Sequence, residues 1–160
     1  MLEKGIEDGL VEEDLKNLKL LATAYTMSQE MDEAIGAWRD ATKHAEDGQV
    51  YYRLAQALSR EDRHAQAVEA YRGALDEGDL NDPADAQFWM GISLMQLERW
   101  DEATRAFRSA AKDDDKEKSA RQYIQYIDGE RRRQEELRKM VDDTADTSAP
   151  DAPARQPADD

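Results

Sequence analysis

The chain of 160 residues contains no cysteine and only two histidines, His44 and His64. The missing cysteine excludes disulfides and thiolate chemistry, but it leaves the compartment open, because cytosolic and exported proteins can both lack cysteine. The histidines do not have the His-x-x-x-His spacing of a metal site. We expect His64 to pack inside the fold and His44 to be solvated, with no metal and no cofactor.

Long apolar runs and excess positive charge are missing too. No segment approaches the ~20 apolar residues that span a bilayer. The first ten residues, MLEKGIEDGL, lack the basic and apolar regions of a signal peptide. The formal net charge of −15 argues against nucleic acid as a partner and against docking on an anionic membrane, because phosphate binding requires a basic face.

Recognisable catalytic groupings are also lacking. No serine stands in a pattern with a base, and no glycine-rich phosphate loop is present. Asp113, Asp114 and Asp115 lack the glycine and the alternating ligands of an EF-hand loop, so we interpret them as a solvated helix end. We therefore expect no enzymatic activity.

What the sequence does contain is a repeated order of small and large residues around Ala34, Ala67 and Ala103, which lie 33 and 36 residues apart. Small residues match small ones and large residues match large ones, with His64 as a moderate fit. The three registers are Ala22, Tyr25, Met31, Trp38 and Ala41; Ala55, Leu58, His64, Tyr71 and Ala74; and Gly91, Leu94, Trp100, Phe107 and Ala110.

This order predicts pairs of antiparallel helices joined by tight turns. Only glycine or alanine fits where two helix backbones approach closely, and larger side chains fill the gaps on either side. Gly91 costs about 1 kcal/mol relative to alanine inside a helix, and a close helix contact can offset that cost.

The order resembles the tetratricopeptide repeat, a helix pair of 34 residues. The resemblance implies an all-α, right-handed solenoid of three helix hairpins plus a C-terminal capping helix. The family's closing proline is replaced by Glu46, Asp79 and Asp115, and the junction EGDLNDP carries two extra residues. The matching positions include Leu21-Ala22, Tyr51, Leu54-Ala55 and Met90-Gly91 as well as the registers above.

The pattern divides the chain as follows. Residues 15–115 hold three units, at about 15–47, 48–83 and 84–115. Residues 116–141 form a capping helix with an apolar stripe at Ala120, Tyr123, Ile124 and Ile127. Residues 142–160, rich in proline and acid, are expected to be a disordered acidic tail.

The two ends leave alternatives open. Residues 2–9 (LEKGIEDG) are similar to residues 75–82 (LDEGDLND), so we interpret residues 1–14 as the remnant of a preceding repeat and the chain as a piece of a longer repeat protein.

Near the other end, Arg131, Arg132 and Arg133 belong to the solvated cap or, alternatively, to a basic partner site. Glu135 and Glu136 favour the cap, because they can pair along the helix.

In the family, the first helix of each unit lines a concave groove that binds peptides. Carried over by register, the predicted groove residues are Lys16, Lys19 and Thr23; Tyr52, Gln56 and Arg60; and Phe88, Ile92 and Met95. The alternative for Phe88 and Ile92 is that the C-terminal helix covers them. A basic clamp for a chaperone's terminal carboxylate is not supported, because Thr23 replaces the needed asparagine and Asp85 and Trp89 stand where basic residues are needed.

The predicted function is a non-catalytic module that binds a protein or peptide in this groove. The alternative is an assembly subunit that self-associates through its exposed repeat ends, and the oligomeric state stays open. The segments AEDGQVYYRLAQAL, DPADAQFWMGISLMQLERWDEA and KSARQYIQYIDGE also resemble the C-terminal part of bacterial repeat proteins associated with TonB-type energy transduction. That resemblance implies a periplasmic place in an envelope transport complex, with the cytoplasm as the alternative.

Overall fold

The computed structural model describes residues 2–147, with side-chain detail for residues 14–144. The described part consists of seven helices and contains no strand. They are α1 (Leu2–Ser28), α2 (Met31–Thr42), α3 (Gln49–Arg60), α4 (His64–Glu77), α5 (Pro83–Gln96), α6 (Trp100–Ala110) and α7 (Asp114–Thr147). The chain divides into two units, Met1–Ile127 and Asp128–Asp160, and α7 has residues in both.

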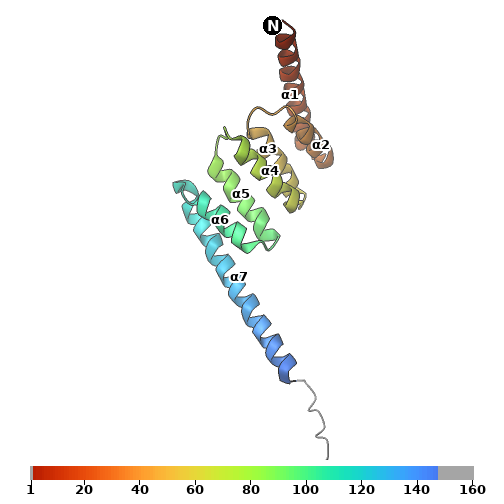
Figure 1. Ribbon diagram of the computed structural model, residues 1–160. Coiled ribbons are helices and arrows are strands. Elements are labelled where there is room, and N and C mark those ends of the chain that lie inside the picture. The colour runs from red at the N-terminus through yellow and green to blue at the C-terminus, as the bar shows by residue number, and fades with distance from the viewer. Residues whose placement is uncertain (1, 148–160) are drawn as a thin grey trace, which may run out of the picture. The chain divides into compact units, whose positions relative to one another are not determined.

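The first unit is a stack of helix pairs (Figure 1). Helices α1 and α2, α3 and α4, and α5 and α6 contact each other as pairs, and each pair contacts the next through α2 with α3 and α4 with α5. The all-α solenoid that the repeated pattern predicts is therefore confirmed.

The turns inside the three pairs share one backbone geometry. Gln29, Asp62 and Glu98 occupy equivalent positions and have φ angles of 64°, 54° and 56°. A left-handed residue followed by an amide that bonds back five residues is a common way to end a helix, because it satisfies carbonyls that the helix leaves free. The three N–H···O distances are each 2.9 Å, for Glu30 to Tyr25, Arg63 to Leu58 and Arg99 to Leu94.

The small residues of the repeat lie in the core, as predicted. Ala34, Ala67 and Ala103 are each 0% exposed. The large residues four positions later, Trp38, Tyr71 and Phe107, are buried as well. Close helix contact at the alanines and filling by the neighbouring rings together account for the burial.

The start of α5 is determined locally. The side chain of Asp82 accepts a hydrogen bond of 2.8 Å from the backbone N–H of Asp85, and Pro83 occupies the first turn. An aspartate cap satisfies a free amide, and proline there loses no helical hydrogen bond. Asp82 and Pro83 together therefore favour a helix that begins at this point.

The two ends differ from the predicted boundaries. Helix α1 runs without a break from Leu2 to Ser28, so residues 1–14 have no helix boundary of their own, and residues 5–9 do not repeat the non-helical path of residues 78–82. Their origin in an earlier repeat stays a prediction.

At the other end, α7 continues to Thr147, so residues 142–147 are helical rather than disordered. No proline interrupts the helix before Pro150, and the residue before a proline disfavours helical geometry. The rest of the predicted tail, residues 148–160, lies outside the described residues.

Candidate functional site

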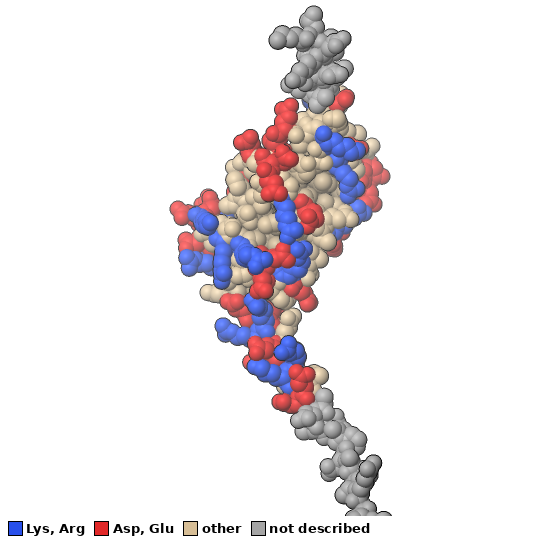
Figure 2. All heavy atoms as spheres, in the orientation of Figure 1, with Lys and Arg blue, Asp and Glu red and all other residues tan. Residues whose placement is uncertain are grey.

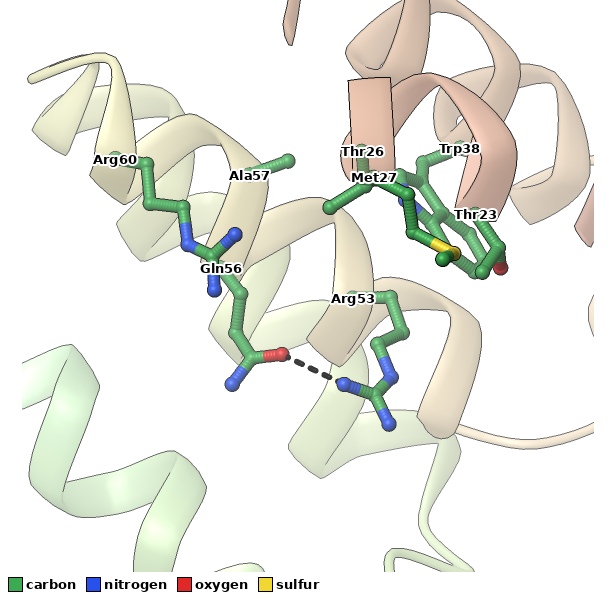
Figure 3. A pocket seen from close by; sticks show the side chains of 8 residues that line it. All are labelled: Thr23, Thr26, Met27, Trp38, Arg53, Gln56, Ala57 and Arg60. Carbon is green, nitrogen blue, oxygen red and sulfur yellow. Dashed lines mark hydrogen bonds between the residues drawn. The ribbon is translucent and has the colours of Figure 1, made fainter. Parts of the chain in front are cut away.

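A groove runs between α1 and α3, and we call it the α1–α3 groove. Its hollow has a volume of about 240 Å³. Figure 3 shows residues of α1 along one side, together with the ring of Trp38 from α2, and residues of α3 along the other. Its lining consists of Thr23, Thr26, Met27, Trp38, Arg53, Gln56, Ala57 and Arg60.

One side of the groove is apolar in character. Met27 is 81% exposed beside the edge of Trp38, which is otherwise buried. The hydroxyls of Thr23 and Thr26 each donate a 2.7 Å hydrogen bond to a carbonyl one turn earlier in α1. Because these hydroxyls are already paired, this side offers mainly carbon and sulfur to a ligand.

The α3 side is cationic. The guanidinium of Arg53 donates a 3.2 Å hydrogen bond to the side-chain oxygen of Gln56 (Figure 3). Within the described residues, neither Arg53 nor Arg60 forms an ion pair with a carboxylate. The two arginines are seven residues apart, which is about 10 Å along a helix. The groove therefore presents two separated cations.

A second, shallower hollow extends the groove along α1. It is lined by Leu15, Lys16, Lys19, Leu20, Thr23 and Glu46, and it shares Thr23 with the α1–α3 groove. The two lysines have no carboxylate within ion-pair distance among the described side chains. Four cationic side chains thus follow one face of α1 and α3 in a chain whose net charge is −15.

Tyr52, also predicted for the groove, is engaged in a polar network instead. Its hydroxyl donates to the carboxylate of Asp85 on α5, and the same hydroxyl accepts a 3.1 Å hydrogen bond from Gln56. The ammonium of Lys116 on α7 donates to the other oxygen of Asp85. The network joins α3, α5 and α7, which are alternate helices along the chain.

Burial and pairing shift the pKa values inside this network. Although burial alone raises the pKa of Asp85, the hydrogen bonds from Lys116 and Tyr52 outweigh it and lower that pKa. Burial and the hydrogen bond to Asp85 raise the pKa of the Tyr52 hydroxyl. The hydrogen bond to Asp85 raises the pKa of Lys116. The network is therefore a carboxylate between a neutral hydroxyl and an ammonium.

The three predicted residues of unit three do not line the α1–α3 groove. The ring of Phe88 packs edge-on against Phe107 and against Tyr123 of α7, with centroids 5.6 Å apart in each case. Ile92 and Met95 are half-buried and pack against the same core cluster. The alternative interpretation, in which the C-terminal helix covers Phe88, describes the structure better, because α7 supplies the partner ring.

The structure also adds groove residues that the sequence did not suggest. Arg53 lies at the position after Tyr52, and its spacing of seven from Arg60 could have indicated a shared face. Trp38 belongs to the second helix of its pair and matches a core position of the repeat, so no periodicity would have revealed its exposed edge.

Other kinds of site are not favoured by the described residues. Within residues 14–144, no group of three or more histidine, aspartate and glutamate side chains is placed to hold a metal ion. None of the described helices is both long and apolar enough to cross a bilayer. Figure 2 shows acidic and basic side chains interspersed over the visible face, with uncharged surface between them.

Comparison with known proteins connects this geometry to a family. Residues 49–77 and 85–117, which contain α3–α4 and most of α5–α6 with its flanks, match the tetratricopeptide repeat family. Both segments are thus similar to the tetratricopeptide repeat. The α1–α2 pair lies outside the matched residues, yet it has the same turn geometry as the two matched repeats. A comparison with curated proteins gives no match.

Solved tetratricopeptide domains share the fold. The TPR2B domain of yeast Sti1 in complex with an Hsp70 peptide is 15% identical, with a TM-score of 0.62, and the alignment covers 74% of this chain and 98% of that one. The first TPR of Spaghetti (RPAP3), bound to the HSP90 peptide SRMEEVD, is 17% identical, with a TM-score of 0.62 and coverage of 73% and 92%. The C-terminal domain of a Plasmodium falciparum FK506-binding protein is 16% identical, with a TM-score of 0.65 and coverage of 82% and 95%.

Proposed function

We propose that this chain is a non-catalytic protein-interaction module, and that its α1–α3 groove binds an extended acidic segment of a partner protein. The observation that carries the proposal is the pair of arginines on α3. Arg53 and Arg60 line a hollow and have no carboxylate partner among the described residues. Arginine binds carboxylates with charge-assisted hydrogen bonds, and two such groups about 10 Å apart suit two acidic side chains of an extended peptide.

The apolar side of the groove defines what should lie between those acidic residues. Met27 and the edge of Trp38 offer a surface for an aliphatic side chain. Methionine adapts to irregular partners because its chain is flexible and its sulfur polarisable. The favoured ligand is therefore an acidic segment with one apolar residue between two carboxylates.

Two of the structural neighbours are bound to peptides, and the peptide bound to Spaghetti, SRMEEVD, contains three acidic residues. This chain departs from a clamp for a terminal carboxylate, because Asp85 lies beside Tyr52 and contributes negative charge. The proposed recognition therefore uses side-chain carboxylates within a segment, and amidation of the peptide's C-terminus should not weaken it.

Fluorescence anisotropy with a labelled probe peptide of ten residues, alternating glutamate and leucine, tests the proposal. Replacing both arginines, Arg53→Glu and Arg60→Glu, should weaken binding of this probe at least tenfold, because each charge-assisted hydrogen bond contributes roughly 1.5–3 kcal/mol. Raising the salt concentration should weaken binding to the wild-type chain, since these contacts are exposed.

The matched control is the double variant Arg105→Glu and Arg108→Glu, which makes the same charge change on exposed positions of α6. This variant should bind the probe as the wild-type chain does. A control peptide that carries lysine in place of glutamate should not bind the wild-type chain. Equal binding of the acidic probe by the wild-type chain and the Arg53/Arg60 variant would refute the groove as the binding site.

A narrower proposal concerns the place of this module. The resemblance of three segments to TonB-associated repeat proteins supports a partner in a bacterial envelope transport complex and a periplasmic location for the module. Fractionation of cells that express the native gene tests it directly. Recovery of the protein with cytoplasmic markers would contradict this location and leave the peptide-binding proposal standing.

A further inference from the structure

Trp89 of α5 is an aromatic residue that the core leaves exposed. It is 43% exposed, and Tyr126 is the one other exposed aromatic residue in the described part of the chain. Trp89 precedes Gly91 by two positions, as Arg53 of the α1–α3 groove precedes Ala55 in the repeat before. Trp89 therefore lies on the face of α5 that corresponds to the groove face of α3.

Two contacts hold the ring of Trp89 in place. It packs edge-on against Phe88, with centroids 5.7 Å apart and an angle of 88° between the ring planes. Its indole N–H donates a hydrogen bond to the carboxylate of Asp85, one turn earlier in α5, and helps to lower the pKa of that carboxyl. An aromatic side chain that is already fixed loses little conformational entropy when a partner binds, so Trp89 is suited to anchor one.

The carboxylate of Asp85 also connects Trp89 with the α1–α3 groove. Asp85 accepts a hydrogen bond from the hydroxyl of Tyr52, and that hydroxyl accepts a 3.1 Å hydrogen bond from the amide of Gln56, which lines the groove. Packed helices lie about 8–10 Å apart, and an extended chain covers such a distance in about three residues. A segment bound in the groove can therefore reach the ring of Trp89 with its next residues.

The charges around Asp85 are mainly negative, in contrast to those of the groove. The ammonium of Lys116 pairs with Asp85 and lies 4.0 Å from Asp82, and the charge of Asp113 also helps to raise its pKa. Three carboxylates thus surround one ammonium, and no residue within one turn of Trp89 on α5 is basic. A carboxylate that accepts the indole N–H also makes the face of the ring more negative. This combination favours a cation on the ring.

We propose that Trp89 is a second anchor for the partner segment and binds an arginine side chain that flanks the acidic residues. This inference rests on the proposed function, because the acidic residues held at Arg53 and Arg60 bring the arginine to the ring. A guanidinium stacks on an indole face through a cation–π contact, for which tryptophan is the best of the aromatic side chains. The recognised segment is therefore bipolar, with carboxylates in the groove and a cation about three residues beyond them.

Fluorescence anisotropy with extended versions of the acidic probe tests the inference. Gly-Ser-Arg is added at both ends, so that either direction of the segment is covered, and the reference peptide carries citrulline, an uncharged isostere, in place of arginine. At about 150 mM salt, where long-range attraction by the net charge is screened, the arginine peptide should bind the wild-type chain at least about threefold more tightly than the citrulline peptide. In Trp89→Leu this advantage should disappear, whereas the unextended probe should bind with unchanged affinity.

The matched control is Tyr126→Leu, which removes the other exposed aromatic ring and should leave the arginine advantage intact. Circular dichroism checks that both variants keep their helices. NMR of the assigned indole N–H signals in the wild-type chain gives a readout that needs no variant. The signal of Trp38, which lines the groove, should shift equally with both peptides, whereas the signal of Trp89 should shift further with the arginine peptide.

The possible results distinguish this inference from the proposed function. Binding of the acidic probe without an arginine advantage, an advantage that persists in Trp89→Leu, or equal shifts of the Trp89 signal with both peptides would overturn the inference and leave the proposed function intact. Loss of the advantage in Tyr126→Leu would place the cation on another ring and overturn it as well. Failure of the wild-type chain to bind the unextended probe would refute the proposed function and this inference together.

Discussion

Gly91 of α5 faces the ring of Phe107 on α6. A Cβ atom added there would be 2.9 Å from the ring of Phe107, which is 0% exposed. That ring is also stacked on Tyr123 with centroids 5.1 Å apart, so it cannot easily move away. The first two pairs carry Ala22 and Ala55 at this position. The third pair thus combines the smallest residue with a ring held from the other side.

Gly91→Ala should therefore lower the free energy of unfolding. Overpacking a tight core contact costs about 1–3 kcal/mol, which exceeds the gain of about 1 kcal/mol in helix propensity. The matched control is Gly36→Ala in α2, where an added Cβ meets no atom within 4 Å, and it should raise the stability by up to about 1 kcal/mol. Urea titrations followed by circular dichroism measure both. A stabilised Gly91→Ala variant would show that the helices can separate at this point.

Helices α3, α5 and α7 are held together by polar contacts as well as by apolar packing. Tyr52 of α3, Asp85 of α5 and Lys116 of α7 form a chain of hydrogen bonds along the stack. The ammonium of Lys116 also lies 5.9 Å from the centre of the Phe88 ring, within the range of a cation–π contact. Partly buried charged groups are stabilising only when each of them is paired, and here the pairing depends on three helices at once.

Asp85→Asn should destabilise the chain by about 1–2 kcal/mol at neutral pH, because it weakens two hydrogen bonds to a charged group. The pKa of Asp85 is lowered in the folded state, so its contribution is present above the unfolded pKa of about 3.9 and is lost as the pH falls through the folded pKa. The difference between wild type and variant should shrink accordingly in urea titrations between pH 7 and pH 3.

The control for this prediction is Asp76→Asn, at an exposed aspartate near the end of α4. This substitution should change the stability little at either pH.

At alkaline pH the stability depends on pH in the opposite direction and falls as the pH rises. Burial raises the pKa of Tyr71 to about 12, and the pKa of Tyr52 is raised as well. Above about pH 10 the unfolded chain loses protons that the folded chain retains, so stability should fall. A difference between Asp85→Asn and wild type that does not depend on pH would contradict the role of charge.

Two opposing electrostatic effects act on the whole molecule. The net charge of −15 disfavours a compact state through self-repulsion. Ion pairs between successive helix pairs act in the other direction, with Asp32 2.5 Å from Arg63 and Glu102 2.7 Å from Arg72. These pairs are partly exposed, and such pairs contribute at most about 1 kcal/mol each. Repulsion summed over the chain should therefore be the larger effect.

Adding salt should accordingly stabilise the fold. Between about 10 mM and 150 mM ionic strength, the Debye length falls from about 30 Å to about 8 Å, so long-range repulsion is screened before contacts at ion-pair distance. We expect the free energy of unfolding to rise by on the order of 1 kcal/mol, measured by urea titration in NaCl. KCl at equal ionic strength must give the same rise. A fall in stability would show that the ion pairs between helix pairs outweigh the repulsion.

Much of the architecture could be predicted from the sequence, because a helix pair leaves a local, periodic trace. The alanines at 34, 67 and 103, the turns between paired helices and the cap at Asp82 each depend on residues within one or two turns of chain. Steric exclusion at close contacts permits few residue types there, so the order of small and large residues was enough to identify the repeat.

The candidate site depends on contacts between successive helix pairs, and sequence periodicity does not record those contacts. Register predicted a groove position for Thr23, Gln56 and Arg60, which line the hollow between α1 and α3. It could not show that Tyr52 is held by Asp85 or that Phe88 packs on Tyr123. The register also could not show that an edge of Trp38 borders the groove, because the repeat pattern assigns Trp38 to the core. A local pattern records which face of a helix is buried, whereas only the tertiary structure decides which neighbour covers that face and which part stays open to a partner.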